Sequence, residues 1–397
     1  MMKFNFKDST ILILYQIVFL VGSVYFVSIF TTKVGLVDFG KFSLFMAKSG
    51  FFSTIIFGPI VSSVNRFYYD EEYQKNKLAF SFSFKVLIFA IIPFALISIL
   101  IKNKFYAEIA QSISYAGCLM IFSLYAKYEN SLIKRIKFIF FKSIPLVLKF
   151  ISLLILIFYF PDYSIINNLL LSSIIISFLI LFYFYFKPNT LNFKNEFRNQ
   201  LKIFSYSKSF FLVSLFTWVE NFSDRFIVDY YLGESILGSY IAIKQYFYST
   251  FLIGCTLLQQ YISPYVYNGF SVFRFFLKYK LYFFIVLVLL ITISFLFALR
   301  VSDLLLPTMT IDKIALVGFV FSGFVYLIAN ILYLEVDYHK LIKKTIFIKF
   351  FSSLIILIVL IISIFHNTSY MAFSYSFGHL LFLTYIIFLL WPKIKNI

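Results

Sequence analysis

Charged residues are scarce in this sequence. They make up 13% of the 397 residues, whereas hydrophobic residues make up 61%. An ordinary soluble domain carries roughly 25% charged residues, so this composition excludes a soluble domain. It predicts an all-α polytopic membrane protein. Acidic residues are rarer than basic ones, with 17 Asp and Glu against 35 Lys and Arg. Because the basic residues lie between apolar runs and not on one surface, the net charge of +18 does not indicate a nucleic-acid partner.

Residues with metal or redox chemistry are equally few. The two cysteines, Cys118 and Cys255, both lie inside apolar runs, so neither a disulfide framework nor a metal site is expected. The histidines are His339, His366 and His379, and none has an acid or a second histidine at metal-ligand spacing. The phosphate-loop pattern GxxxxGK[ST] does not occur, so ATP hydrolysis is not expected. We therefore predict no catalytic residue, no cofactor and no metal.

Apolar runs long enough to cross a bilayer fill most of the chain. A spanning helix needs about 20 apolar residues. On that measure we expect twelve spans, in two six-helix halves around a central cavity. They are 9–30, 41–63, 82–101, 106–126, 138–160, 164–186, 208–231, 236–262, 281–299, 313–334, 342–364 and 369–391.

Lysine and arginine concentrate in every second connection between these spans. The longest such connections are 64–81, 127–137 and 187–207, and the basic connections lie on the same side as both termini. The positive-inside rule therefore predicts that both termini are cytoplasmic. The connections on the other side are short, and none resembles a catalytic domain, so the chain is not expected to be an enzyme.

A short motif recurs at the same point of each half. Residues 34–42 read VGLVDFGKF and residues 232–240 read LGESILGSY, an offset of 198 residues. Both share a glycine, four residues, and a second glycine two residues before an aromatic. We therefore divide the chain into an N-terminal bundle at 1–186, a cytoplasmic linker at 187–207 and a C-terminal bundle at 208–397. Duplicated halves are typical of transporters that hold the substrate between them.

The span 208–231 carries charges that a lipid-facing helix would not tolerate. They are Glu220, Asp224, Arg225 and Asp229. Each Lys, Arg or Asp near the centre of a span costs about 2.5–3.5 kcal/mol on insertion scales, whereas each Leu or Ile returns only about 0.3–0.6. We therefore expect this helix to face other protein, water or a ligand. The three carboxylates are expected to pair with cations or to take part in ion coupling.

Further basic residues fall inside apolar spans. Lys48, Lys244 and Arg225 lie about 10–12 Å below the outer surface if helices rise 1.5 Å per residue, and Lys149 lies deeper. Neither Lys48 nor Lys244 has an acid three or four residues away, so we expect both to face a ligand. For Arg225, a structural pairing with a carboxylate and a ligand contact stay open. Lys85 and Lys349 lie within about two turns of the cytoplasmic face, where lysines can snorkel to water.

These features together resemble a known family. The run Ser223 to Tyr240, reading SDRFIVDYYLGESILGSY, with Pro264 closing its second helix, resembles the start of the second half of polysaccharide exporters and O-antigen flippases. These proteins belong to the multidrug/oligosaccharidyl-lipid/polysaccharide (MOP) superfamily. In the first half, Gly35 and Gly40 lead into a helix that ends in Asn65-Arg66.

The resemblance implies a bacterial inner-membrane flippase. Its substrate would be an undecaprenyl-pyrophosphate-linked oligosaccharide of the O-antigen or capsule type, moved by alternating access. Lys48, Arg225 and Lys244 would face the cavity, and the partners would be membrane lipids and other polysaccharide-assembly proteins. Two alternatives stay open: a small-molecule or cation antiporter of the same superfamily, and an integral-membrane glycan polymerase or ligase.

Overall fold

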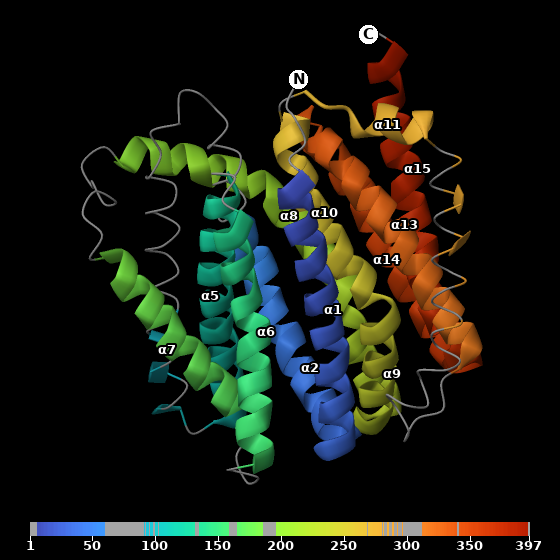
Figure 1. Ribbon diagram of the computed structural model, residues 1–397. Coiled ribbons are helices and arrows are strands. Elements are labelled where there is room, and N and C mark those ends of the chain that lie inside the picture. The colour runs from blue at the N-terminus through green and yellow to red at the C-terminus, as the bar shows by residue number, and fades with distance from the viewer. Residues whose placement is uncertain are drawn as a thin grey trace. The chain divides into compact units, whose positions relative to one another are not determined.

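Every regular element in the described residues is a helix, which confirms the expected all-α fold (Figure 1). The computed structural model describes residues 6–59, 103–131, 135–158, 165–185, 196–267, 269–279, 312–339 and 341–395, with scattered positions in 91–101 and 281–296. Among these, five helices are long and apolar enough to cross a membrane, or six if the pair α9 and α10, bent by 43°, forms one span. The expected spans 82–101 and 281–299 lie largely outside the described residues, and the count of twelve stays a prediction.

The chain forms two compact units, and α1, α2 and α8 each run from one unit into the other. The first unit comprises residues 1–19 and 42–218. Its boundary therefore differs from the proposed division at 187–207, which stays a prediction. The elements that contribute to it are α1 (Phe6–Lys33), α2 (Leu36–Phe51), η1 (Phe52–Phe57), α5 (Lys104–Ser131), α6 (Arg135–Phe158), α7 (Ile165–Tyr185) and α8 (Glu196–Leu232).

Helices α5, α6 and α7 pack on one another in the first unit. The rings of Tyr125 and Phe141 stack between α5 and α6 with centroids 5.3 Å apart. The hydroxyls of Ser152 and Ser172 lie 3.4 Å apart between α6 and α7. Small polar residues of this kind let membrane helices approach closely and bond across the interface.

Helix α2 changes to a π-helix over Phe52–Phe57, directly before Gly58-Pro59. A proline has no N–H, and its ring clashes with the carbonyl four residues earlier, here that of Ile55. A wider π turn is one of the ways in which a helix accommodates such a residue. The position of this change follows from the sequence, and a hinge here stays a hypothesis.

The second unit comprises residues 20–41 and 219–397. Its elements after α8 are α9 (Glu234–Phe247), α10 (Ser249–Tyr267), α11 (Val272–Lys278), α13 (Lys313–Tyr338), α14 (Ile342–His366), η3 (Thr368–Ala372) and α15 (Phe373–Lys395). Helices α13, α14 and α15 lie side by side (Figure 1). Phe273, Ala329 and Phe382 pack in its apolar core, from α11, α13 and α15.

The two copies of the glycine motif meet inside the second unit. Gly35 and Gly233 both have positive φ, 114° and 83°, so each turn needs a residue without a Cβ. Gly40 in α2 lies against the carbonyl of Glu234, where a Cβ would come within 2.5 Å of the oxygen. At Gly238 in α9, a Cβ would come within 2.1 Å of the carbonyl oxygen of Leu36. Gly40 and Gly238, the second glycines of the two motif copies, thus allow the backbones of α2 and α9 to come into direct contact.

Candidate functional site: a buried ionic cluster on α8

The charged helix predicted from the sequence carries two buried carboxylates in the second unit. Glu220 is 0% exposed and Asp224 is 1% exposed, although they lie on consecutive turns of α8. A buried ionised carboxylate is stable only with a counter-charge and hydrogen bonds. Each of the two has a lysine from a different helix as its counter-ion.

Asp224 pairs with Lys244 of α9. The Lys244 ammonium donates hydrogen bonds to Asp224 Oδ2 at 2.9 Å, to the backbone carbonyl of Asn221 at 3.0 Å and to the hydroxyl of Tyr375 at 2.8 Å. An ammonium has three N–H donors, so these contacts use all of them. The side chain of Lys244 is 4% exposed, and the pair therefore joins α8, α9 and α15 away from solvent.

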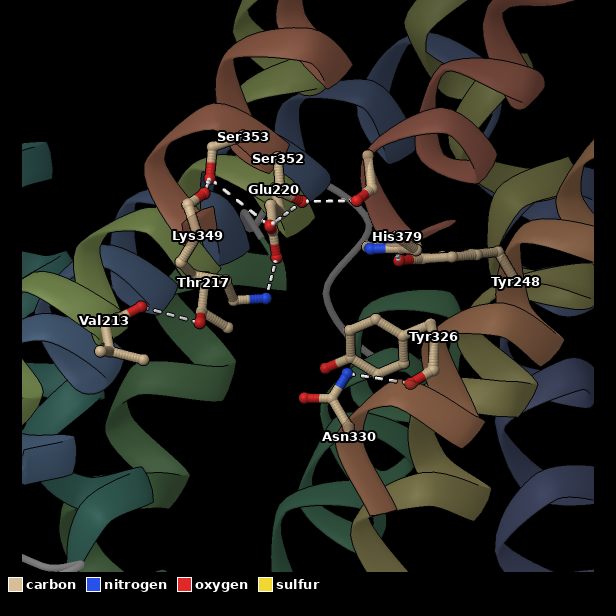
Figure 2. A network of polar contacts seen from close by, with 11 residues as sticks. Val213, Thr217, Glu220, Tyr248, Tyr326, Asn330, Lys349, Ser352, Ser353 and His379 are labelled. Atoms are coloured by element: carbon tan, nitrogen blue, oxygen red, sulfur yellow. Dashed lines mark hydrogen bonds and ion pairs between the residues drawn. The ribbon is translucent and has the colours of Figure 1, made fainter. Parts of the chain in front are cut away.

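Glu220 pairs with Lys349 of α14, and Figure 2 shows the residues around it. Glu220 Oε2 lies 2.5 Å from the Lys349 ammonium, and Oε1 accepts a hydrogen bond from Ser352 at 2.8 Å. The Ser353 hydroxyl lies 3.5 Å from Oε1. Ser352 also lies 2.9 Å from the carbonyl of Gly378 in α15. This arrangement brings α8, α14 and α15 together around one carboxylate.

Aromatic residues border both ion pairs. The Lys244 ammonium lies 4.5 Å from the ring centroid of Tyr375, and the Lys349 ammonium lies 4.1 Å from that of Phe382. Tyr248 and His379 share a hydrogen bond of 2.8 Å between the hydroxyl and Nε2, and their rings are parallel within 4° (Figure 2). His379 is buried and is therefore a packed, hydrogen-bonded histidine.

Arg225 and Asp229, the other charges of α8, also lie in the second unit. Arg225 is 9% exposed, and its guanidinium lies 4.9 Å from the ring centroid of Phe222 on the same helix. Asp229 is half-buried near the end of α8, and its backbone carbonyl accepts a hydrogen bond from Gly233. Arg225 is therefore buried among other groups of the second unit, and the roles expected for Arg225 and Asp229 stay predictions.

Lys48 and Lys149 lie in the first unit. The Lys48 ammonium on α2 is 2.7 Å from Glu108 Oε2 on α5, and the two side chains are 31% and 39% exposed. Lys149 is half-buried on α6, one turn after Pro145. Lys48 and Lys244 thus belong to different units, and each has a carboxylate from another helix as its partner.

The expectation that Lys349 snorkels to the cytoplasmic face is wrong. Its side chain is 3% exposed and contacts Glu220, and it completes the ionic cluster. Distance from the end of a span does not reveal that a lysine turns inward toward an acid on another helix. The only signal was the charge balance within the apolar part of α8: residues 209–231 carry three carboxylates and one arginine, so further cations had to come from elsewhere in the fold. Lys85 lies outside the described residues.

Metal-ligating side chains do not cluster in the part of the chain that the structure describes: no group of three or more His, Cys, Asp or Glu is arranged to hold an ion there. Cys118 and Cys255 are both buried and unpaired.

The fold is helical, and five of the described helices, or six if the bent pair α9 and α10 is one span, are long and apolar enough to cross a membrane. Among solved structures it is similar to a lipid II flippase MurJ in an inward closed conformation, with 15% identity and a TM-score of 0.63 over 97% of this chain and 87% of that one. It is also similar to the MATE multidrug transporter DinF-BH, with 15% identity and a TM-score of 0.64 over 97% and 95% of the two chains. An inward-facing MATE family transporter of the MOP superfamily matches with 13% identity and a TM-score of 0.57, over 96% and 94%.

No protein-family model and no curated protein sequence matches the chain. The similarity therefore lies in the fold.

Proposed function

We propose that this protein is a flippase that moves an undecaprenyl-pyrophosphate-linked oligosaccharide, of the O-antigen or capsule type, across the bacterial inner membrane by alternating access. The observation that carries the proposal is the set of basic side chains inside apolar helices, in a chain with the fold of a lipid II flippase. Lys244 and Arg225 are 3% and 9% exposed, where ordinary membrane helices carry no charge. The substrate would cross as a lipid-linked molecule while the protein is surrounded by membrane lipids. Other polysaccharide-assembly proteins are candidate partners.

A pyrophosphate group suits these cations. It is dianionic, and ammonium and guanidinium groups bind phosphate oxygens through charge-assisted hydrogen bonds that strengthen at low dielectric. We propose that Lys48, Lys149, Arg225 and Lys244 contribute to this binding. Glu108 and Asp224 would act as resting partners for Lys48 and Lys244, and would keep the lysines charged while no substrate is bound.

A small-molecule or cation antiporter is the second candidate. MATE structures match this fold with a TM-score of up to 0.64, as well as the flippase does. Glu220 and Asp224 are buried carboxylates of the kind that such an antiporter could use as an ion site. Against this reading, each already has a lysine ammonium within 2.9 Å. An open cation site would need that ammonium to leave. A glycan polymerase or ligase, the third alternative, has no specific observation in its favour.

The deciding experiment is transport by the purified protein in liposomes. A fluorescent undecaprenyl-pyrophosphate-linked oligosaccharide in the inner leaflet should become accessible to an impermeant quencher added outside. Lys48→Ala should slow this exchange, whereas Lys343→Ala should not, because Lys343 is an exposed lysine on α14. Exchange equal to that of protein-free liposomes, combined with ion-driven export of a small cationic dye, would favour the antiporter.

A further inference from the structure

Apart from the Lys349 ammonium, the groups that contact one another around Glu220 offer more hydrogen-bond acceptors than donors. The Ser352 hydroxyl lies within hydrogen-bond distance of both Glu220 Oε1 and the Gly378 carbonyl, at 2.8 and 2.9 Å. A hydroxyl has one hydrogen, so it can donate to only one of them at a time. The Ser353 hydroxyl donates to the carbonyl of Lys349 at 2.8 Å. We call the oxygen atoms of Glu220, Ser352, Ser353 and Gly378 the Glu220 nest.

An oxygen-rich nest of this kind is a cation environment. Carboxylate, hydroxyl and backbone carbonyl oxygens are the ligands that hard metal cations prefer. The nest is buried, with Glu220 at 0% and Ser352 at 0% exposure, so bulk water does not solvate the carboxylate and a cation has to balance its charge. The cation that the structure places there is the ammonium of Lys349, 2.5 Å from Glu220 Oε2 (Figure 2).

We propose that the Lys349 ammonium acts as a built-in cation that occupies a monovalent-cation site at the Glu220 nest. The wild-type protein then takes no metal ion at Glu220, and the nest binds sodium only when the ammonium is removed. Because Lys349 is tethered to α14 and Glu220 to α8, its charge also joins the two helices without a dissociable ion. The inference goes beyond the proposed function and does not rest on it, since it concerns ion occupancy and not the transported molecule.

The test is the thermal unfolding midpoint of purified full-length protein in detergent, in sodium chloride and in choline chloride at matched ionic strength. Choline is a quaternary ammonium much larger than a sodium ion and has no N–H donor, so a difference between the two salts reports sodium binding. The variants are Lys349→Met, the double variant Lys349→Met/Glu220→Gln, and Lys343→Met as an exposed-lysine control on the same helix. We expect wild type and the control to have the same midpoint in both salts.

In choline chloride, Lys349→Met should have a lower unfolding midpoint than wild type. In sodium chloride its midpoint should rise by about 3 °C or more, and the rise should level off as the sodium concentration increases. The double variant should lose the sodium response, because its amide carries no charge. A second probe is ethylammonium added to Lys349→Ala, which should raise the midpoint more than tetramethylammonium does, since only the former fits and donates hydrogen bonds.

Three results would overturn the proposal. The first is a sodium-specific rise in the wild-type midpoint that Glu220→Gln abolishes, because the site would then already be open. The second is a Lys349→Met protein with equal midpoints in both salts. The third is a failure of both Lys349→Met and Lys349→Ala to accumulate, even with sodium or ethylammonium present. The nest would then have no affinity for a free cation. Each result is read without any transport assay, so it is independent of the flippase proposal.

Discussion

Gly40 and Gly238 occupy equivalent positions in the two motif copies, and each lies against the first residue of the helix that carries the other. Gly40 contacts the carbonyl of Glu234, which begins α9, and Gly238 contacts the carbonyl of Leu36, which begins α2. Both pairs are related by the same offset of 198 residues. Such reciprocity is the signature of a local two-fold relationship between repeats. It explains why the second glycine of the motif is needed as well as the first.

A methyl group at either position should separate the two helices. In Gly40→Ala the new Cβ would lie 2.5 Å from a backbone oxygen that no side-chain movement can relieve. We expect a loss of about 1–3 kcal/mol in stability, as for other overpacked sites. The measurement is the thermal unfolding midpoint in detergent. Gly254→Ala on α10 is the matched control, because a Cβ there meets no atom within 4 Å, and its midpoint should stay the same or rise.

The helices and their turns were predictable because hydrophobic length and glycine spacing are local properties. The expected spans 138–160 and 342–364 coincide with α6 and α14 to within three residues at each end. The partners of the buried lysines were not predictable by the same means. Lys48 pairs across 60 residues and Lys349 across 129, so a rule that searches for acids three or four residues away finds neither.

The buried pair Asp224–Lys244 should behave as a structural unit. Removing one charge, as in Lys244→Met or Asp224→Asn, leaves the other buried without its counter-ion, at a cost of about 3–5 kcal/mol. The double variant should recover much of the stability. The measurement is a double-mutant cycle on the unfolding midpoint. A double variant as unstable as the sum of the singles would show that the two residues do not interact.

Lys48 offers a test of substrate binding with little effect on folding. The Lys48–Glu108 pair is 31% and 39% exposed, and such pairs contribute about 0–1 kcal/mol. Lys48→Ala should therefore accumulate normally and lose most flipping activity, whereas Lys48→Arg should keep much of it. Full flipping by Lys48→Ala in liposomes would remove this lysine from the mechanism.

The orientation can be measured with single cysteines. The native Cys118 and Cys255 are 0% and 2% exposed, so they should add little background to an impermeant thiol reagent. Ser235 and Lys343 are both exposed, near the start of α9 and α14. If both termini are cytoplasmic, Ser235→Cys should be labelled in intact cells and Lys343→Cys only after the cells are opened. The reverse pattern would show the opposite orientation.

Arg225 distinguishes a structural charge from a ligand contact. If it mainly balances a carboxylate, Arg225→Ala should be poorly inserted or degraded, because a buried charge is left without a partner at a cost of about 3–5 kcal/mol. Adding Asp229→Asn or Asp224→Asn should then restore abundance and transport together. If Arg225 binds pyrophosphate, the single variant should accumulate and fail to transport, and no carboxylate change should rescue it.

We expect a mixed result for Arg225, because Asp224 already has the Lys244 ammonium at 2.9 Å and Arg225 itself is 9% exposed. Neutralising Asp224 would leave Lys244 without its acid, so Asp229→Asn is the cleaner second change. Abundance should recover in part in Arg225→Ala/Asp229→Asn, and transport should not. Immunoblots of membranes and the liposome assay measure the two separately. Full transport by this double variant would show that Arg225 does not hold the substrate.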